Sequence, residues 1–286
     1  MSKINHSRKP LILGQPVIAR KYGQNVVLQT DLKRGRPEHI SHVKTADVRG
    51  QNTTSLKRTM TQIRELIAAN FDGKLGKGGV FITLTFSDDT IGGNAKSASY
   101  ESEKFVKRLK RWLAREFPKK SVVYLSVIEP QPKRSDNVGM LIWHFHILMK
   151  FEDNSPFRIE KQFLQEKLWK QGVVWITSLS SYKSVSGYVA TYLTDLSLET
   201  SNNKARIKGE KLRLYPAGLR IYRGSQNLKR PLVERFETKA DALEAFGLSD
   251  GTSNFVSTFE WSHEETGFQF TSEYYQLQYN EECKDE

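Results

Sequence analysis

Residues 139–150 read GMLIWHFHILMK, an apolar and aromatic run that carries two histidines at alternate positions. This composition predicts a β-strand over residues 140–150. Successive side chains of a strand point to opposite faces, so His144 and His146 share one face and the apolar residues around them take the other. Two neighbouring imidazoles are a candidate metal-binding pair. The plain alternative is a polar pair on the solvent side of a half-buried strand.

The other strands and helices that the sequence predicts alternate irregularly along the chain. Amphipathic spacing predicts helices over residues 53–70, 101–116 and 185–198, and another that begins near residue 155 and stops at Gly172. Runs of β-branched and aromatic residues predict strands over 80–86, 121–128 and 173–177, and short β-like runs lie at 17–19 and 26–29. No glycine-rich phosphate loop follows a strand. We therefore predict an α+β fold with a central antiparallel sheet flanked by helices.

A metal site needs a further ligand, and the strand before the histidines offers one. Glu129 ends the strand predicted over residues 121–128, and antiparallel pairing would return it beside His144 and His146. Gln131 is a candidate additional ligand. Two imidazoles and one carboxylate leave coordination positions open, which suits a Mg²⁺ or Mn²⁺ ion that polarises a phosphate. The single cysteine, Cys283, excludes a cysteine-rich metal site.

Two tyrosines lie four residues apart in the helix predicted over residues 185–198. Tyr188 and Tyr192 therefore share one face of that helix. A phenol has a pKa near 10, so as a nucleophile it needs a polarised phosphate and the loss of its proton. The same spacing recurs at Tyr275 and Tyr279, so the pair alone is weak evidence, and packing of Tyr192 in the core is an open alternative.

Charge is distributed unevenly along the chain. The 286 residues carry a formal charge of +12, with 44 Lys and Arg against 32 Asp and Glu. Residues 234–286 hold 13 acidic and three basic residues, so residues 1–233 carry +22. A surface so basic attracts polyanions such as nucleic acid. We divide the chain into a basic N-terminal arm (1–52), a central domain (53–233) and an acidic C-terminal extension (234–286).

Composition also excludes several classes of protein. A hydrophobic content of 38% and one cysteine exclude a disordered tail and a disulfide scaffold. No run of 18 apolar residues occurs, so we expect a cytoplasmic protein without a membrane partner.

Five segments of the chain carry a resemblance to a known family. They are RTMTQIRELIAANF (58–71), VFITLTF (80–86), IEPQ (128–131) followed by GMLIWHFHIL (139–148), GYVATYLTD (187–195) and LRIYRGSQNLKRP (219–231). In this order the segments resemble the rolling-circle replication initiators of bacterial plasmids and filamentous phages. These initiators belong to the HUH superfamily of metal-dependent tyrosine endonucleases, named for a His-hydrophobic-His motif. The resemblance covers roughly residues 53–233, and the order is more specific than any one segment.

The resemblance implies a fold and an activity. It implies a ferredoxin-like plait that cuts one strand at an origin, forms a 5′-phosphotyrosine link and leaves a 3′-hydroxyl for a host polymerase. The residues that match the family motifs are Thr83 and Thr85 for holding single-stranded DNA, Glu129, His144 and His146 for the metal, and Tyr188 and Tyr192 for attack. Relatives with a single tyrosine keep the second position, which favours Tyr192. No ATPase loop of the GxxxxGKS type is present, so unwinding would require a host helicase.

Basic residues that follow the tyrosines are expected to grip the DNA backbone. They are Lys204, Arg206, Lys208, Lys211, Arg213, Arg220, Arg223, Lys229 and Arg230. Tyr215 and Tyr222 are candidate platforms for stacked bases. A solvated loop is the alternative for this segment.

One departure from the family pattern bears on activity. The family has Lys three residues after each motif tyrosine, where this chain has Thr191 and Asp195. We expect Lys183 or a basic residue of segment 219–231 to substitute for it. The departure also motivates a second hypothesis, a DNA-binding replication or regulatory factor without nicking activity. A relaxase or transposase of the same superfamily ranks lower, because no third motif histidine and no nucleophile near the amino end are evident, as does an RNA-binding protein of similar topology.

Overall fold

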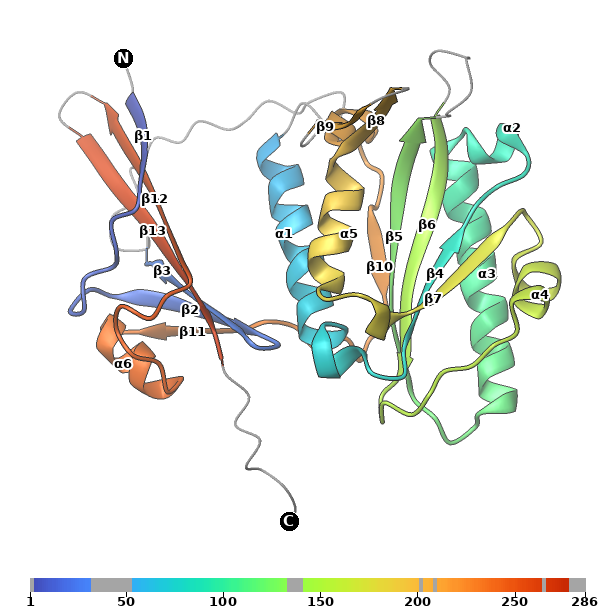
Figure 1. Ribbon diagram of the computed structural model, residues 1–286, viewed down its shortest axis with the longest axis horizontal. Helices are drawn as coiled ribbons and strands as arrows, with labels where there is room; N and C mark the ends of the chain where they lie inside the picture. Colours follow the sequence, from blue (N-terminus) through green and yellow to red (C-terminus); the bar gives the residue numbers. More distant parts are fainter. Residues whose placement is uncertain are drawn as a thin grey trace. The chain divides into compact units, whose positions relative to one another are not determined.

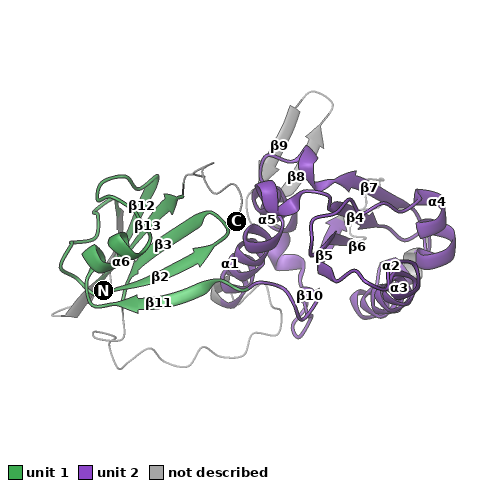
Figure 2. Ribbon diagram, turned by 90° about the horizontal axis from the view of Figure 1, so that it is seen from below, with its two compact units in different colours: residues 1–43, 230–286 green, residues 44–229 purple. Residues whose placement is uncertain are grey.

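A computed structural model describes residues 3–31, 53–132, 141–200, 203–207, 210–263 and 266–277. The chain divides into two compact units, residues 44–229 and residues 1–43 with 230–286 (Figure 2). Within the described ranges, no helix is both long and apolar enough to cross a membrane.

The unit of residues 44–229 is built on a five-stranded antiparallel sheet. Its order is β10 (Tyr222–Gly224), β5 (Val122–Pro132), β6 (Leu141–Phe151), β4 (Val80–Leu84) and β7 (Val174–Ser178). Helices α1 (Thr53–Asn70) and α5 (Val185–Thr194) cover one face, and α3 (Ala95–Glu116) covers the other (Figure 1). Apolar side chains of the strands and helices form one core in this unit. The predicted α+β fold, with an antiparallel sheet flanked by helices, is confirmed.

Several predicted elements differ in length from those observed. The helix predicted over 185–198 ends at Thr194, and a hairpin of β8 (Leu196–Thr200) and β9 (Asn203–Ile207) follows it. The helix predicted to begin near 155 is short: α4 (Lys161–Phe163) continues into the π-helix η4 (Leu164–Trp169). The helical path ends at Lys170, which has a left-handed φ of 67°. The other short elements of this unit are η3 (Gly73–Gly76), α2 (Asp89–Gly92), η5 (Leu179–Ser181) and η6 (Glu210–Leu214).

Gly172 follows that short helix at a place where only glycine fits. A Cβ atom there would lie 2.4 Å from the Thr85 carbonyl oxygen. The glycine therefore allows the chain to pass close to the end of β4 before it enters β7.

The second unit joins the two ends of the chain in one sheet. Its order is β1 (Lys3–Ser7), β12 (Phe255–His263), β13 (Thr266–Gln276), β3 (Asn25–Thr30), β2 (Val17–Tyr22) and β11 (Leu232–Phe236), with α6 (Lys239–Ala245) beside it. The structure thus groups the chain differently from the three expected segments, because strands of the N-terminal arm pair with strands of the acidic extension. Charge contrast along the sequence does not report which strands pair across 200 or more residues.

A buried ion cluster lies inside this second unit. The side chains of Lys239 and Glu273 are each 1% exposed, and their charged atoms are 3.0 Å apart. The Glu273 carboxylate also accepts hydrogen bonds from the Leu11 amide and the Tyr275 hydroxyl. Burial, followed by the bond to Glu273, raises the pKa of Tyr275 and keeps this phenol protonated. The cluster therefore ties α6 and the N-terminal segment to β13.

We expect Lys239→Met to destabilise the protein by about 3–5 kcal/mol, because it leaves the buried Glu273 carboxylate without its cation. The control is Lys9→Met, since the Lys9–Glu260 pair has a lysine that is 63% exposed and such pairs contribute at most about 1 kcal/mol. Urea unfolding of the full chain measures both. Equal losses for the two variants would show that the buried cluster contributes nothing beyond a surface pair.

Candidate active site

Strand register places the predicted polar residues on one face of the five-stranded sheet. Glu129 lies directly opposite His144, and His146 lies opposite both Val127 and Thr83. Residues paired in this way share a face. The face is the one that α1 and α5 cover (Figure 1). The sheet therefore brings the residues predicted from two strands of the sequence together with Thr83 from a third.

His146 is buried in the middle of a hydrogen-bond chain. Its Nε2 lies 2.7 Å from Glu129 Oε2, and its Nδ1 lies 3.1 Å from Thr83 Oγ1. A carboxylate only accepts, so Nε2 carries a proton and donates it to Glu129. Thr83, Glu129 and His146 thus fix one another on three neighbouring strands. Both ring nitrogens of His146 are engaged within the protein.

Helix α5 brings both motif tyrosines over this face. Ser184 caps the helix as predicted, accepting a hydrogen bond from the Gly187 amide, and Asp72 accepts one from the Ser186 amide at 2.8 Å. The ring of Tyr192 meets the His146 ring edge-on, with centroids 4.8 Å apart, and the Tyr188 ring stacks on Tyr192 at 5.6 Å. The helix start is therefore fixed to the loop after α1, and the tyrosines are held beside His146.

The two tyrosines differ in environment. Tyr188 is 40% exposed and also contacts the rings of Phe81 and Tyr182. Partial burial, with smaller contributions from Tyr182 and Glu129, raises the pKa of Tyr188 above its ordinary value of 10. Tyr192 lies next to the buried histidine and carboxylate, so it is the tyrosine nearer to the predicted ligands.

A lysine that our prediction of site residues placed only among the backbone-gripping residues occupies the centre of the site. The Lys211 side chain, 7% exposed, forms an ion pair with Glu129 Oε1. Its Nζ also donates to the Tyr192 carbonyl oxygen at 3.1 Å and lies 5.0 Å from the centroid of the Tyr192 ring. Glu129 is fully buried, so a nearby cation is what keeps its negative charge tolerable. Lys211 comes from η6, beyond the β8–β9 hairpin, and no spacing rule points to it.

The donor chemistry of this face suits a divalent cation. Burial lowers the pKa of His144 to about 4, so its imidazole is neutral at pH 7 and can act as a nitrogen ligand. Gln131 follows Glu129 on the same face of β5, and its Oε1 is buried without a hydrogen-bond partner. A neutral imidazole, a carboxylate and an amide oxygen are ligands that Mn²⁺ and Mg²⁺ accept.

These donors are nevertheless not gathered around a common point. Among the described residues, no three His, Cys, Asp or Glu side chains stand close enough together to hold a metal ion. The two oxygens of Glu129 are instead taken by His146 and Lys211.

The residues predicted to bind DNA fall at several places. The Thr85 hydroxyl donates to the Val173 carbonyl at 2.9 Å and joins β4 to β7. Lys183 is exposed just before α5, and Lys229 and Arg230 are exposed at the junction of the two units. Arg220 and Arg223 line a pocket on the opposite face of the sheet. Of the remaining basic residues, Lys208 and the side chains of Lys204 and Arg206 lie outside the described part of the chain.

The prediction that Tyr215 stacks on bases is wrong. Its side chain is fully buried, and its hydroxyl donates to the Ile128 carbonyl at 3.1 Å. The aromatic residue fills the core between η6 and β5, which the basic residues around it in the sequence did not reveal.

Comparison with known proteins identifies part of this unit. Residues 79–197 match the family model of replication-associated proteins of the ORF2 type. The match begins just before β4 and ends after α5, so it includes Thr83, Glu129, both histidines and both tyrosines, and Lys211 lies beyond it. It spans less than half of the chain. Neither a curated protein nor a solved structure matches the chain.

Proposed function

We propose that the protein initiates DNA replication by cutting one strand of an origin through a tyrosine nucleophile. The carrying observation is the position of Tyr192, whose ring lies 4.8 Å from that of His146 on the face that also holds Glu129 and Lys211. The match of residues 79–197 to a replication-associated family supports a replication initiator. The basic composition is suited to a DNA substrate.

In this proposal Tyr192 attacks the scissile phosphorus through its phenolic oxygen. A P–O bond to the tyrosine forms, the P–O3′ bond breaks, and the 3′ oxygen leaves as a hydroxyl after taking up a proton. The phosphodiester energy is kept in the phosphotyrosine ester, so the reverse step can rejoin the strand. The free 3′-hydroxyl would prime a host polymerase, and unwinding would need a host helicase. Tyr188, stacked on Tyr192, is placed to serve a second transfer.

Charge at the site comes from two sources in this proposal. Lys211, beside Tyr192, supplies the positive charge that Thr191 and Asp195 do not. Glu129, His144 and His146 would hold a Mg²⁺ or Mn²⁺ ion, with Gln131 as a further oxygen donor. Such an ion, when bound, would polarise the scissile phosphate and offset the charge that develops on it. Thr83 orients His146 through its hydroxyl.

A second candidate function is DNA binding in replication or its regulation, without cleavage. It is favoured by the Lys211 ammonium on Glu129, which holds the carboxylate that a metal would need. The absence of the usual lysine three residues after each tyrosine favours it too.

Incubation with supercoiled origin-bearing plasmid separates the two candidates. With Mn²⁺ present we expect nicked circles that carry covalently bound protein, and we expect chelation by EDTA to abolish them while salt-sensitive DNA binding persists. His144→Ala should reduce nicking at least a hundredfold, as loss of a metal ligand does, with little change in binding. Binding of plasmid without any adduct at any Mn²⁺ concentration would support the second function.

A further inference from the structure

A basic pocket lies on the face of the sheet that α3 covers. Its volume is about 370 Å³. The floor is formed by alternate residues of β5, Tyr124, Ser126 and Ile128, with Phe145 of β6. Strand alternation directs these side chains away from the face that carries Glu129 and His146. The pocket is therefore separated from the candidate active site by the thickness of the sheet.

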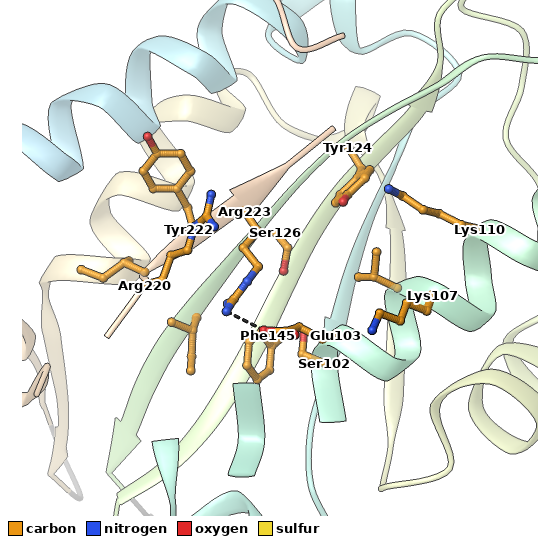
Figure 3. A pocket seen from close by; sticks show the side chains of 13 residues that line it. Ser102, Glu103, Lys107, Lys110, Tyr124, Ser126, Phe145, Arg220, Tyr222 and Arg223 are labelled. Carbon is orange, nitrogen blue, oxygen red and sulfur yellow. Dashed lines mark ion pairs between the residues drawn. The ribbon is translucent and has the colours of Figure 1, made fainter. Parts of the chain in front are cut away.

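Cations stand on both sides of this pocket. Lys107 and Lys110 project from α3 on one side, and Arg223 of β10 lies on the other (Figure 3). Arg220 also lines it, and Glu103, which pairs with Arg223 at 2.5 Å, is the one carboxylate among the lining residues. Lys110 Nζ lies 4.9 Å from the centroid of the Tyr124 ring, so an ammonium is held over the floor. Four cations against one anion make the pocket complementary to a phosphate-bearing ligand.

The lining favours a DNA backbone over a free nucleotide. Lys107 and Lys110 are exposed and lie about one helical turn apart, so they can contact successive phosphates of an extended strand. Among the described lining residues there is no Asn, Gln or Asp, the side chains that read base edges, and the floor is largely apolar. The pocket also adjoins β10, an edge strand, around which a strand of DNA could pass from one face to the other.

We propose that this pocket, Lys107 and Lys110 above all, is a second binding site for single-stranded DNA. The site contacts the backbone without reading sequence, on the opposite face of the sheet from the tyrosines. The identity of the ligand as DNA rests on the proposed function. The cleaved strand, or its continuation, is then held at two places, and the chemistry occurs at only one of them.

Fluorescence anisotropy with a labelled single-stranded oligonucleotide tests the site in the full chain. Replacing Lys107 and Lys110 together by Ala should weaken binding about tenfold, and the slope of log K against log salt should fall by about 1.4 for two lost phosphate contacts. The matched control is Arg111→Ala with Arg115→Ala, which removes the same charge from exposed positions of α3 outside the pocket. Losses no larger than those of the control would overturn the proposal.

Two further arms separate the possible outcomes. Thymidine 5′-monophosphate, at matched phosphate concentration, should not displace the oligonucleotide, and displacement that the lysine variant loses would assign the pocket to a free nucleotide instead. Adduct formation at saturating protein should keep its wild-type rate in the lysine variant. If the wild-type chain binds through the pocket but forms no adduct, the pocket stands and the proposed cleavage fails. If the adduct forms and the lysines do not contribute to binding, the pocket alone fails.

Discussion

Tyr192→Phe is expected to abolish the covalent protein–DNA adduct, lowering its rate of formation by on the order of a thousandfold or more. The substitution removes the attacking oxygen and nothing else from the ring that packs against His146. The measurement is denaturing gel electrophoresis of the protein after reaction with labelled single-stranded origin DNA and Mn²⁺. Binding of the same DNA should change little, because the aromatic ring remains in place.

Companion variants at the neighbouring tyrosines make this experiment specific. Tyr188→Phe should retain the first adduct and lose only strand transfer that needs a second nucleophile. Tyr182→Phe is the control from the same ring cluster, since its hydroxyl lies 3.3 Å from that of Thr177 and faces no predicted ligand. Persistence of the adduct in Tyr192→Phe with Tyr188→Phe would remove both residues from the mechanism.

Local sequence patterns predicted the framework of the site well. The alternation of His144 and His146 in a strand, and the four-residue spacing of Tyr188 and Tyr192, describe how each pair lies on its own element. Glu129 could be placed opposite the histidines because antiparallel neighbours joined by one loop pair in a defined register. These inferences depend on contacts between adjacent elements, which the sequence specifies directly.

Features that depend on contacts distant in sequence were not predictable. Lys211 reaches Glu129 from 82 residues away, and its ion pair depends on how η6 packs under α5. The pairing of β2 with β11 likewise joins an arm and an extension that differ strongly in charge. The pocket on the α3 face combines residues of α3, β5, β6 and the segment before β10, so no single motif contains it.

Lys211→Met is expected to lower the rate of strand cleavage by about a hundredfold to a thousandfold at saturating Mn²⁺. It removes the cation that lies between Glu129 and Tyr192, where Thr191 and Asp195 provide no positive charge. Lys211→Arg should retain much of the activity, because it keeps the charge. Lys183→Met, at an exposed position before α5, should weaken DNA binding modestly and leave the cleavage rate of bound DNA within a few-fold of wild type.

The Mn²⁺ dependence of these variants distinguishes two roles for Lys211. A lysine that stabilises charge on the phosphate lowers the maximal rate when it is lost, whatever the Mn²⁺ concentration. A lysine that only neutralises Glu129 in the absence of metal would, when lost, tighten Mn²⁺ binding and leave the maximal rate unchanged. Because loss of one partner of a buried pair costs about 3–5 kcal/mol, rates are compared below the melting temperature of each variant. An unchanged maximal rate with tighter Mn²⁺ binding would therefore assign Lys211 to holding the empty site, and another cation would have to serve the phosphate.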